Sequence, residues 1–202
     1  LMGYVLAHMV GNLKMYLGRA EFDAYAHALR ELLHPIFPNH VVLWILRIGL
    51  IAAFVLHIHA AYSLTRMNQR ARPVKYQSPR DYIAVSFASR TMRWTGVIIL
   101  LYVVFHLADL TWGFANPDFV RGAAYDNLVA SFERVPVALV YVVANIALGI
   151  HLFHGAWSMF QSMGLNSPRY NGARKAFAVG FAALITVGNV AFPIMVLAGV
   201  VD

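Results

Sequence analysis

Cysteine is absent from this sequence, and charged side chains are scarce. The 202 residues include no cysteine, and only 12% of them are charged. Without cysteine the chain has no disulfide, no thiolate zinc site and no cysteine nucleophile, and it cannot hold an iron–sulfur cluster by itself. A soluble domain has about 25% charged residues. The shortage of charge, together with 60% hydrophobic residues, indicates a membrane protein.

Five apolar segments approach the roughly 20 residues that a helix needs to cross a bilayer. In lipid the backbone must close its own hydrogen bonds, so these segments are predicted to be helices. We predict an all-α membrane protein, a single domain over residues 1–202 with five transmembrane helices in a bundle. The first apolar segment is short, so we expect further residues before Leu1. The predicted helices cover residues 1–18, 40–66, 92–114, 135–163 and 174–201.

The basic residues gather in two of the connections between these helices. Residues 67–91 and 164–173 are rich in arginine and lysine, whereas most acidic residues lie in the other two connections. By the positive-inside rule, the two basic loops are predicted to face the cytoplasm, with the C-terminus outside a multi-pass cytoplasmic-membrane protein. The net charge of +7 then reflects topology, and no nucleic-acid partner is expected. No loop is long enough for a substrate-oxidising domain, so such a domain must belong to another chain.

Four histidines lie within four different predicted helices: His8, His59, His106 and His151. Ionisable residues inside a membrane are costly and indicate function. At 1.5 Å per helical residue, His8 and His106 lie ~12–15 Å below the outer helix ends, and His59 and His151 ~24–28 Å below them. Two facing imidazoles suit a six-coordinate haem that transfers electrons. The pattern therefore predicts two b haems stacked across the bilayer, each held at its iron by one histidine pair.

Other interpretations of these histidines remain open. A lone histidine in a helix often only packs, and a haem-free transporter or anchor would use these residues for packing or proton transfer. Structural zinc needs four converging ligands, which two separate pairs do not provide. His57 points away from His59 on a helix, and His154 lies one turn beyond His151, where it is a candidate partner of a haem propionate. Gly11 and Gly155 are expected to leave room for the macrocycle.

The chain resembles the five-helix, dihaem cytochrome b subunit of succinate dehydrogenase and its fumarate reductase relatives. The resemblance extends over essentially the whole chain, and no single motif carries it. Its matching pieces are His8-Met9-Val10-Gly11-Asn12-Leu13, His59-Ala60-Ala61-Tyr62, Arg93-Trp94-Thr95-Gly96, Phe105-His106, and His151 with Gly155-Ala156-Trp157-Ser158.

The resemblance implies ligands, cofactors and partners. It assigns His59 and His151 to a haem b near the cytoplasm and His8 and His106 to a second haem b near the outer face. The Ala-Ala-Tyr after His59 favours it over His57. An iron–sulfur subunit and a flavoprotein that oxidises succinate are the implied partners, with menaquinone as acceptor or donor. An anchor for a hydrogenase or formate dehydrogenase is the alternative.

Several further side chains are candidates for contacts to cofactor or quinone. Arg93, Ser63 and Ser158 are expected near the inner haem level, where they are candidate partners of propionates. Asp109 follows His106 by three residues and therefore shares its helix face. It is a candidate for a quinone site on the outer side, although a hydrogen bond to a neighbouring helix would explain it equally well.

Overall fold

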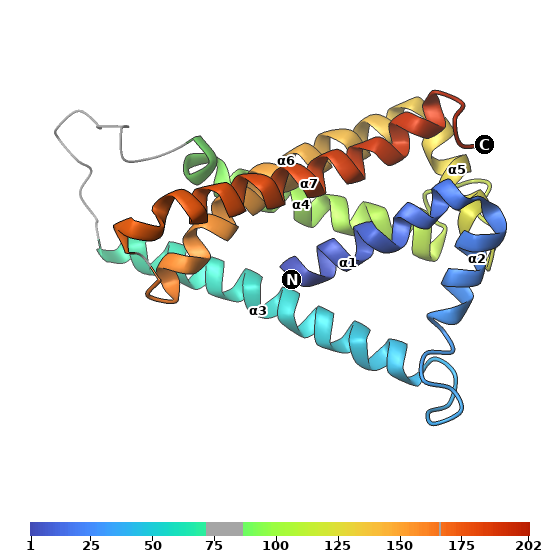
Figure 1. The fold of residues 1–202 in the computed structure, drawn as a ribbon, viewed down its shortest axis with the longest axis horizontal. Helices are drawn as coiled ribbons and strands as arrows, with labels where there is room; N and C mark the ends of the chain where they lie inside the picture. The colour runs from blue at the N-terminus through green and yellow to red at the C-terminus, as the bar shows by residue number, and fades with distance from the viewer. Residues whose placement is uncertain (72–86, 166) are drawn as a thin grey trace.

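The computed structural model describes residues 1–71, 87–165 and 167–202, with only the backbone for residues 87–90. In these ranges every regular element is helical, which confirms the all-α class (Figure 1). Helices occupy all five predicted segments: α1 (Met2–Asn12), α3 (Val41–Ala71), α4 (Phe87–Leu107), α6 (Val135–Ser162) and α7 (Asn171–Leu197). Three short turns extend them. The 3₁₀ turn η1 (Leu13–Leu17) follows α1, the π-helical turn η2 (Ala108–Trp112) follows α4, and the 3₁₀ turn η3 (Pro168–Tyr170) precedes α7.

Four of the described helices are long and apolar enough to cross a membrane. They are α3, α4 with η2, α6 and α7. The chain is therefore a multi-pass membrane protein. Helix α1 has 11 residues, fewer than the roughly 20 that a bilayer requires, so a fifth crossing by residues 1–18 stays a prediction.

Two short helices that the sequence did not reveal cap one end of the bundle. These are α2 (Arg19–Ala28) and α5 (Ala124–Glu133), which lie in the two less basic connections. Figure 1 shows them at the same end of the molecule as the C-terminus, and we call this the capped end. The backbone N–H of Tyr125 donates to Asp23 Oδ1 at 2.9 Å and joins the two helices.

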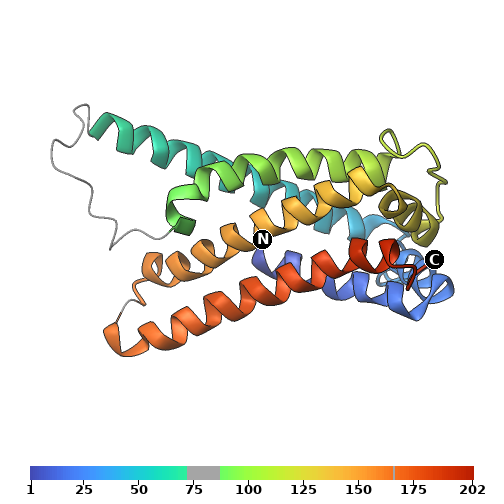
Figure 2. The ribbon, with the colours of Figure 1, turned by 90° about the horizontal axis from the view of Figure 1, so that it is seen from above.

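The pair α6 and α7 forms the core of the bundle, and α4 packs on the other side of α6 (Figure 2). Small residues let the α6 and α7 backbones approach closely, as is usual where helices meet in lipid. A Cβ on Gly149 would clash with Thr186 Oγ1 of α7. A Cβ on Gly11 would likewise clash with the Tyr25 hydroxyl. The lack of a side chain at Gly11 therefore lets Tyr25 of α2 approach α1.

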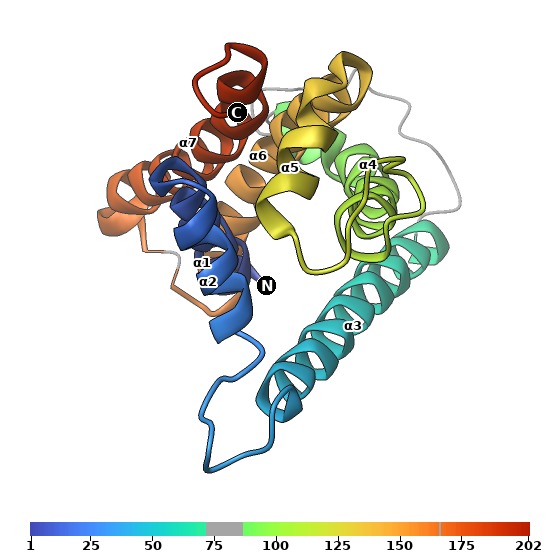
Figure 3. The ribbon, with the colours of Figure 1, turned by 90° about the vertical axis from the view of Figure 1, so that its right-hand side faces the viewer.

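Helix α3 stands apart from the other helices. Figure 3 shows it at the edge of the molecule, and none of its residues is buried. An apolar helix in lipid has no hydrophobic drive to pack against its neighbours. The rotation of α3 about its own axis therefore decides which of its two histidines faces the bundle.

Gly149→Ala is expected to destabilise the protein by about 1–3 kcal/mol relative to Gly180→Ala, because the new methyl group must displace Thr186. The Thr186 hydroxyl donates to the Ala182 carbonyl at 2.7 Å and would lose that bond on moving. Gly180 on α7 has nothing within 4 Å of its Cβ position, so a methyl group there displaces nothing. Because both glycines lie inside helices, the two variants share the same gain in helix propensity. Thermal unfolding of the detergent-solubilised protein measures the difference, and equal midpoints would contradict this account of the α6–α7 contact.

Candidate functional site

The outer pair predicted from the sequence comes together. His8 of α1 and His106 of α4 have ring centres 5.9 Å apart and ring planes at 84°. An imidazole nitrogen binds a transition metal at about 2.0–2.1 Å, and its ring centre lies ~1 Å further, so two imidazoles on opposite sides of one metal have centres roughly 6 Å apart. The separation of His8 and His106 therefore fits one iron atom between them.

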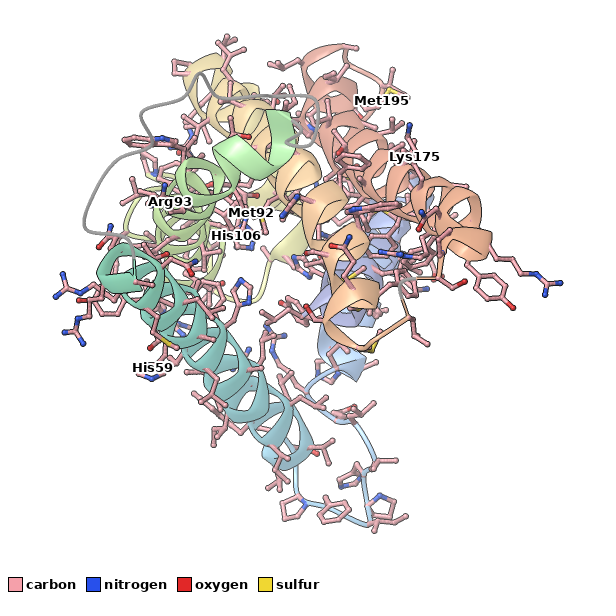
Figure 4. The ribbon with its side chains drawn as sticks, turned by 90° about the vertical axis from the view of Figure 1, so that its left-hand side faces the viewer. His59, Met92, Arg93, His106, Lys175 and Met195 are labelled. Carbon is pink, nitrogen blue, oxygen red and sulfur yellow. The ribbon has the colours of Figure 1, made fainter. Side chains whose placement is uncertain are left out.

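The inner pair differs from the prediction by two residues. His57, not His59, faces His151, with ring centres 6.1 Å apart and ring planes at 76°. His59 is exposed on the side of α3 that faces away from the other helices (Figure 4), and its Nε2 lies 3.5 Å from Ser63 Oγ. Positions two apart on a helix differ by roughly 200°, so only one of the two histidines can face the bundle. In the structure, His57 and not His59 therefore lies beside His151.

The two pairs lie in separate layers. His57 and His151 each follow the first residue of their helix, Val41 or Val135, by 16 positions, which places both ~24 Å along the helix axis. His106, in contrast, is the residue before the last of α4, close to the capped end. The two pairs thus lie at different levels along the bundle.

A threonine fixes the tautomer of His151. Thr95 Oγ1 lies 3.2 Å from His151 Nδ1 and donates its own hydrogen to the Met92 carbonyl at 3.0 Å. Since that hydroxyl hydrogen is committed to a carbonyl, the threonine oxygen accepts from Nδ1–H of the histidine. The Nε2 lone pair of His151 then remains available for a metal, the arrangement that metal-ligating histidines usually show.

A tyrosine fixes the tautomer of His106 in the same way. Tyr141 Oη lies 3.3 Å from His106 Nδ1 and donates to Asp109 Oδ2 at 2.9 Å. The phenol oxygen therefore accepts from Nδ1–H of His106, and Nε2 of this histidine also keeps its lone pair. His106, labelled in Figure 4, lies on the side of α4 nearer the centre of the bundle. The spacing of the two pairs, and the tautomers of His106 and His151, thus fit haem with two histidine ligands.

Asp109 is enclosed within the protein. It is fully buried, with 0% of its side chain exposed, and Arg134 Nη2 contacts Oδ1 at 2.6 Å. Ser131 and Tyr141 both donate to Oδ2. The turn η2 brings the aspartate to this position, and π-helical turns are frequent at functional sites. Both carboxylate oxygens are therefore engaged inside the protein, as in the alternative of a hydrogen bond to a neighbouring helix.

The remaining predicted side chains lie near the end of the bundle opposite the cap. Arg93 is exposed and lines a partly polar cavity of about 390 Å³. Ser158 donates to the His154 carbonyl at 2.8 Å, so its hydroxyl already has a partner in its own helix. His154 itself is half-buried. The other residues lining the cavity, which the sequence did not single out, are Thr65, Asn68 and Gln69.

No role was expected from the sequence for Thr95 or Tyr141, the two residues that contact Nδ1 of His151 and of His106. Each is a hydroxyl-bearing side chain in an apolar helix, but its histidine partner belongs to another helix, so no spacing along the chain connects them. Among the described residues there is no group of three or more His, Asp or Glu side chains placed to hold a metal ion.

Comparison with known proteins identifies one family. The family model described as the succinate dehydrogenase/fumarate reductase transmembrane subunit matches residues 75–190, more than half of the chain. The matched range includes His106 and His151 together with their supporting residues Thr95 and Tyr141. No curated protein and no solved structure matches the chain.

Arg134→Gln is expected to destabilise the protein by about 3–5 kcal/mol, because it leaves the buried Asp109 carboxylate without its cation. The matched control is Arg121→Gln, which changes an exposed arginine. Thermal unfolding of the solubilised protein compares the two. The double variant Asp109→Asn/Arg134→Gln removes both charges and should recover most of the loss. An Arg134→Gln variant as stable as Arg121→Gln would contradict the importance of this ion pair.

Proposed function

The chain belongs to the succinate dehydrogenase/fumarate reductase transmembrane subunit family, and on this premise we propose that it carries electrons through two b haems between an iron–sulfur subunit and a quinone. Family membership makes it a membrane subunit of an enzyme complex that associates with the other subunits. One observation carries the finer proposal. Two facing histidine pairs, 5.9 Å and 6.1 Å between ring centres, lie in two layers of the bundle.

His8 and His106 are the proposed ligands of the outer haem, and His57 and His151 those of the inner one. His57 takes the role first given to His59, because it faces His151 in the bundle. Held by these histidine pairs, haem b would supply one-electron transfer. The hydroxyls of Thr95 and Tyr141 orient two of these rings and keep Nε2 of each free for iron.

We propose that Arg93 and His154 contact the propionates of the inner haem. Arg93 is a cation beside a partly polar cavity at the end of α3, and His154 follows His151 by one helical turn. Ser63 and Ser158 are weaker candidates, because each is already within hydrogen-bonding reach of a partner in its own helix.

We propose that the end opposite the cap faces the cytoplasm and receives the iron–sulfur subunit, which the flavoprotein supplies with electrons from succinate. The charge distribution supports this orientation, because the helix ends that flank the two basic connections, those of α3, α4, α6 and α7, lie at that end (Figure 1). Menaquinone as the partner quinone follows from the family resemblance. The family match also favours succinate dehydrogenase or fumarate reductase over a hydrogenase or formate dehydrogenase anchor.

The purified complex is expected to contain two b haems per copy of this chain, and His57→Ala is expected to contain one. His59→Ala is the matched control in the same helix and should retain both, because its side chain faces away from the bundle. A pyridine haemochrome assay, normalised to the amount of the chain, gives these ratios. Loss of one haem in His59→Ala but not in His57→Ala would restore the pairing first expected from the sequence.

The absence of cysteine allows the proposed orientation to be tested with single introduced thiols. Arg121→Cys lies in the connection between η2 and α5, and Arg169→Cys lies between α6 and α7; both positions are exposed. A membrane-impermeant maleimide should label Arg121→Cys in intact cells and Arg169→Cys only after the membrane is opened. The opposite labelling pattern would reverse the orientation.

A further inference from the structure

The two hydrogen-bonded histidines differ in what lies behind them. Behind His151, the Thr95 hydroxyl donates a hydrogen bond to a neutral backbone carbonyl, that of Met92. Behind His106, the Tyr141 hydroxyl donates a hydrogen bond to the carboxylate of the buried Asp109. The first chain ends on a neutral group and the second on an anion. This asymmetry does not follow from haem binding, since either arrangement would orient an imidazole.

We propose that Tyr141 and Asp109 are positioning residues that strengthen His106 as an iron ligand and so lower the reduction potential of the outer haem. The inference rests on the proposed function, because it presumes a haem at His8 and His106. A hydrogen bond from Nδ1–H to an acceptor raises the basicity of a ligating histidine. A more basic ligand stabilises ferric over ferrous iron, so the haem accepts an electron less readily.

Burial lets the carboxylate act through the tyrosine. Chains of hydrogen bonds polarise one another, and the effect is stronger in a medium of low dielectric constant. Asp109 is fully buried, and Arg134 contacts Oδ1 whereas Tyr141 contacts Oδ2. The Arg134 guanidinium therefore holds the carboxylate in place through Oδ1, while Oδ2 accepts the hydrogen bond from the phenol.

Packing fixes the position of the phenol independently of its hydroxyl. The centre of the Tyr141 ring lies 4.8 Å from that of Phe132 and 5.3 Å from that of Tyr102, with both pairs nearly perpendicular. Phe105 contacts the same ring with its centre at 6.0 Å. Tyr141→Phe consequently keeps these contacts and removes only the link between His106 and Asp109.

A redox titration of the purified complex, followed through its haem absorption bands, tests the proposal. His106→Ala removes the outer haem and His57→Ala removes the inner haem. The absorption bands lost in each variant therefore assign the bands, and hence the potentials, to the two haems. Tyr141→Phe is expected to raise the potential of the outer haem and leave that of the inner haem unchanged. Thr95→Val is the matched control, since it removes the hydroxyl beside His151 and should leave the reduction potential of the outer haem unchanged.

A second variant separates the carboxylate from the tyrosine. Asp109→Asn/Arg134→Gln removes the ion pair without leaving a buried lone charge, and it should raise the potential of the outer haem in the same direction. An unchanged or lowered outer potential in Tyr141→Phe, or equal shifts of both haems, would overturn the proposal. A shift in Tyr141→Phe but none in the double variant would overturn the role of Asp109. Wild-type complex without haem would instead refute the proposed function.

Discussion

A polar side chain inside a bilayer must find its hydrogen-bond partners within the protein, because lipid offers none. This requirement explains the contacts between helices that surround the candidate site. From His106 a continuous series of contacts runs through Tyr141 and Asp109 to Arg134 at the start of α6. It joins α4, η2 and α6, and Ser131 brings in α5. The partners of one histidine thus also hold the capped end of the bundle together.

Helix α3, in contrast, is not held by such a series of polar contacts among the described residues. It has no buried residue, although the ring of His57 lies beside that of His151 and Thr65, Asn68 and Gln69 line the cavity beside Arg93. Under the proposed function, the inner haem would lie between α3 and α6 and add apolar surface on which α3 can pack. Cofactor binding and the final position of α3 would then be coupled.

The sequence was sufficient to predict the helical segments and the two layers of histidines, since both follow from the length of apolar runs and from the rise of a helix. It did not distinguish His57 from His59. That choice depends on the rotation of α3, and a helix that is apolar all round gives no amphipathic pattern from which to read its inner face. The roles of Thr95, Tyr141 and Asp109 depend on contacts between helices far apart in the sequence. The short helices α2 and α5 lie in polar connections, where packing rather than a long apolar run decides the structure.

Under the proposed function, each of two haem irons would have two histidine ligands from this chain. Electron paramagnetic resonance of the oxidised purified complex tests this ligation, because two nitrogen ligands of this kind make ferric haem low-spin. Two low-spin ferric haem signals that together amount to two irons per copy of the chain are expected. A high-spin ferric signal of comparable size, or a single haem signal, would contradict this ligation.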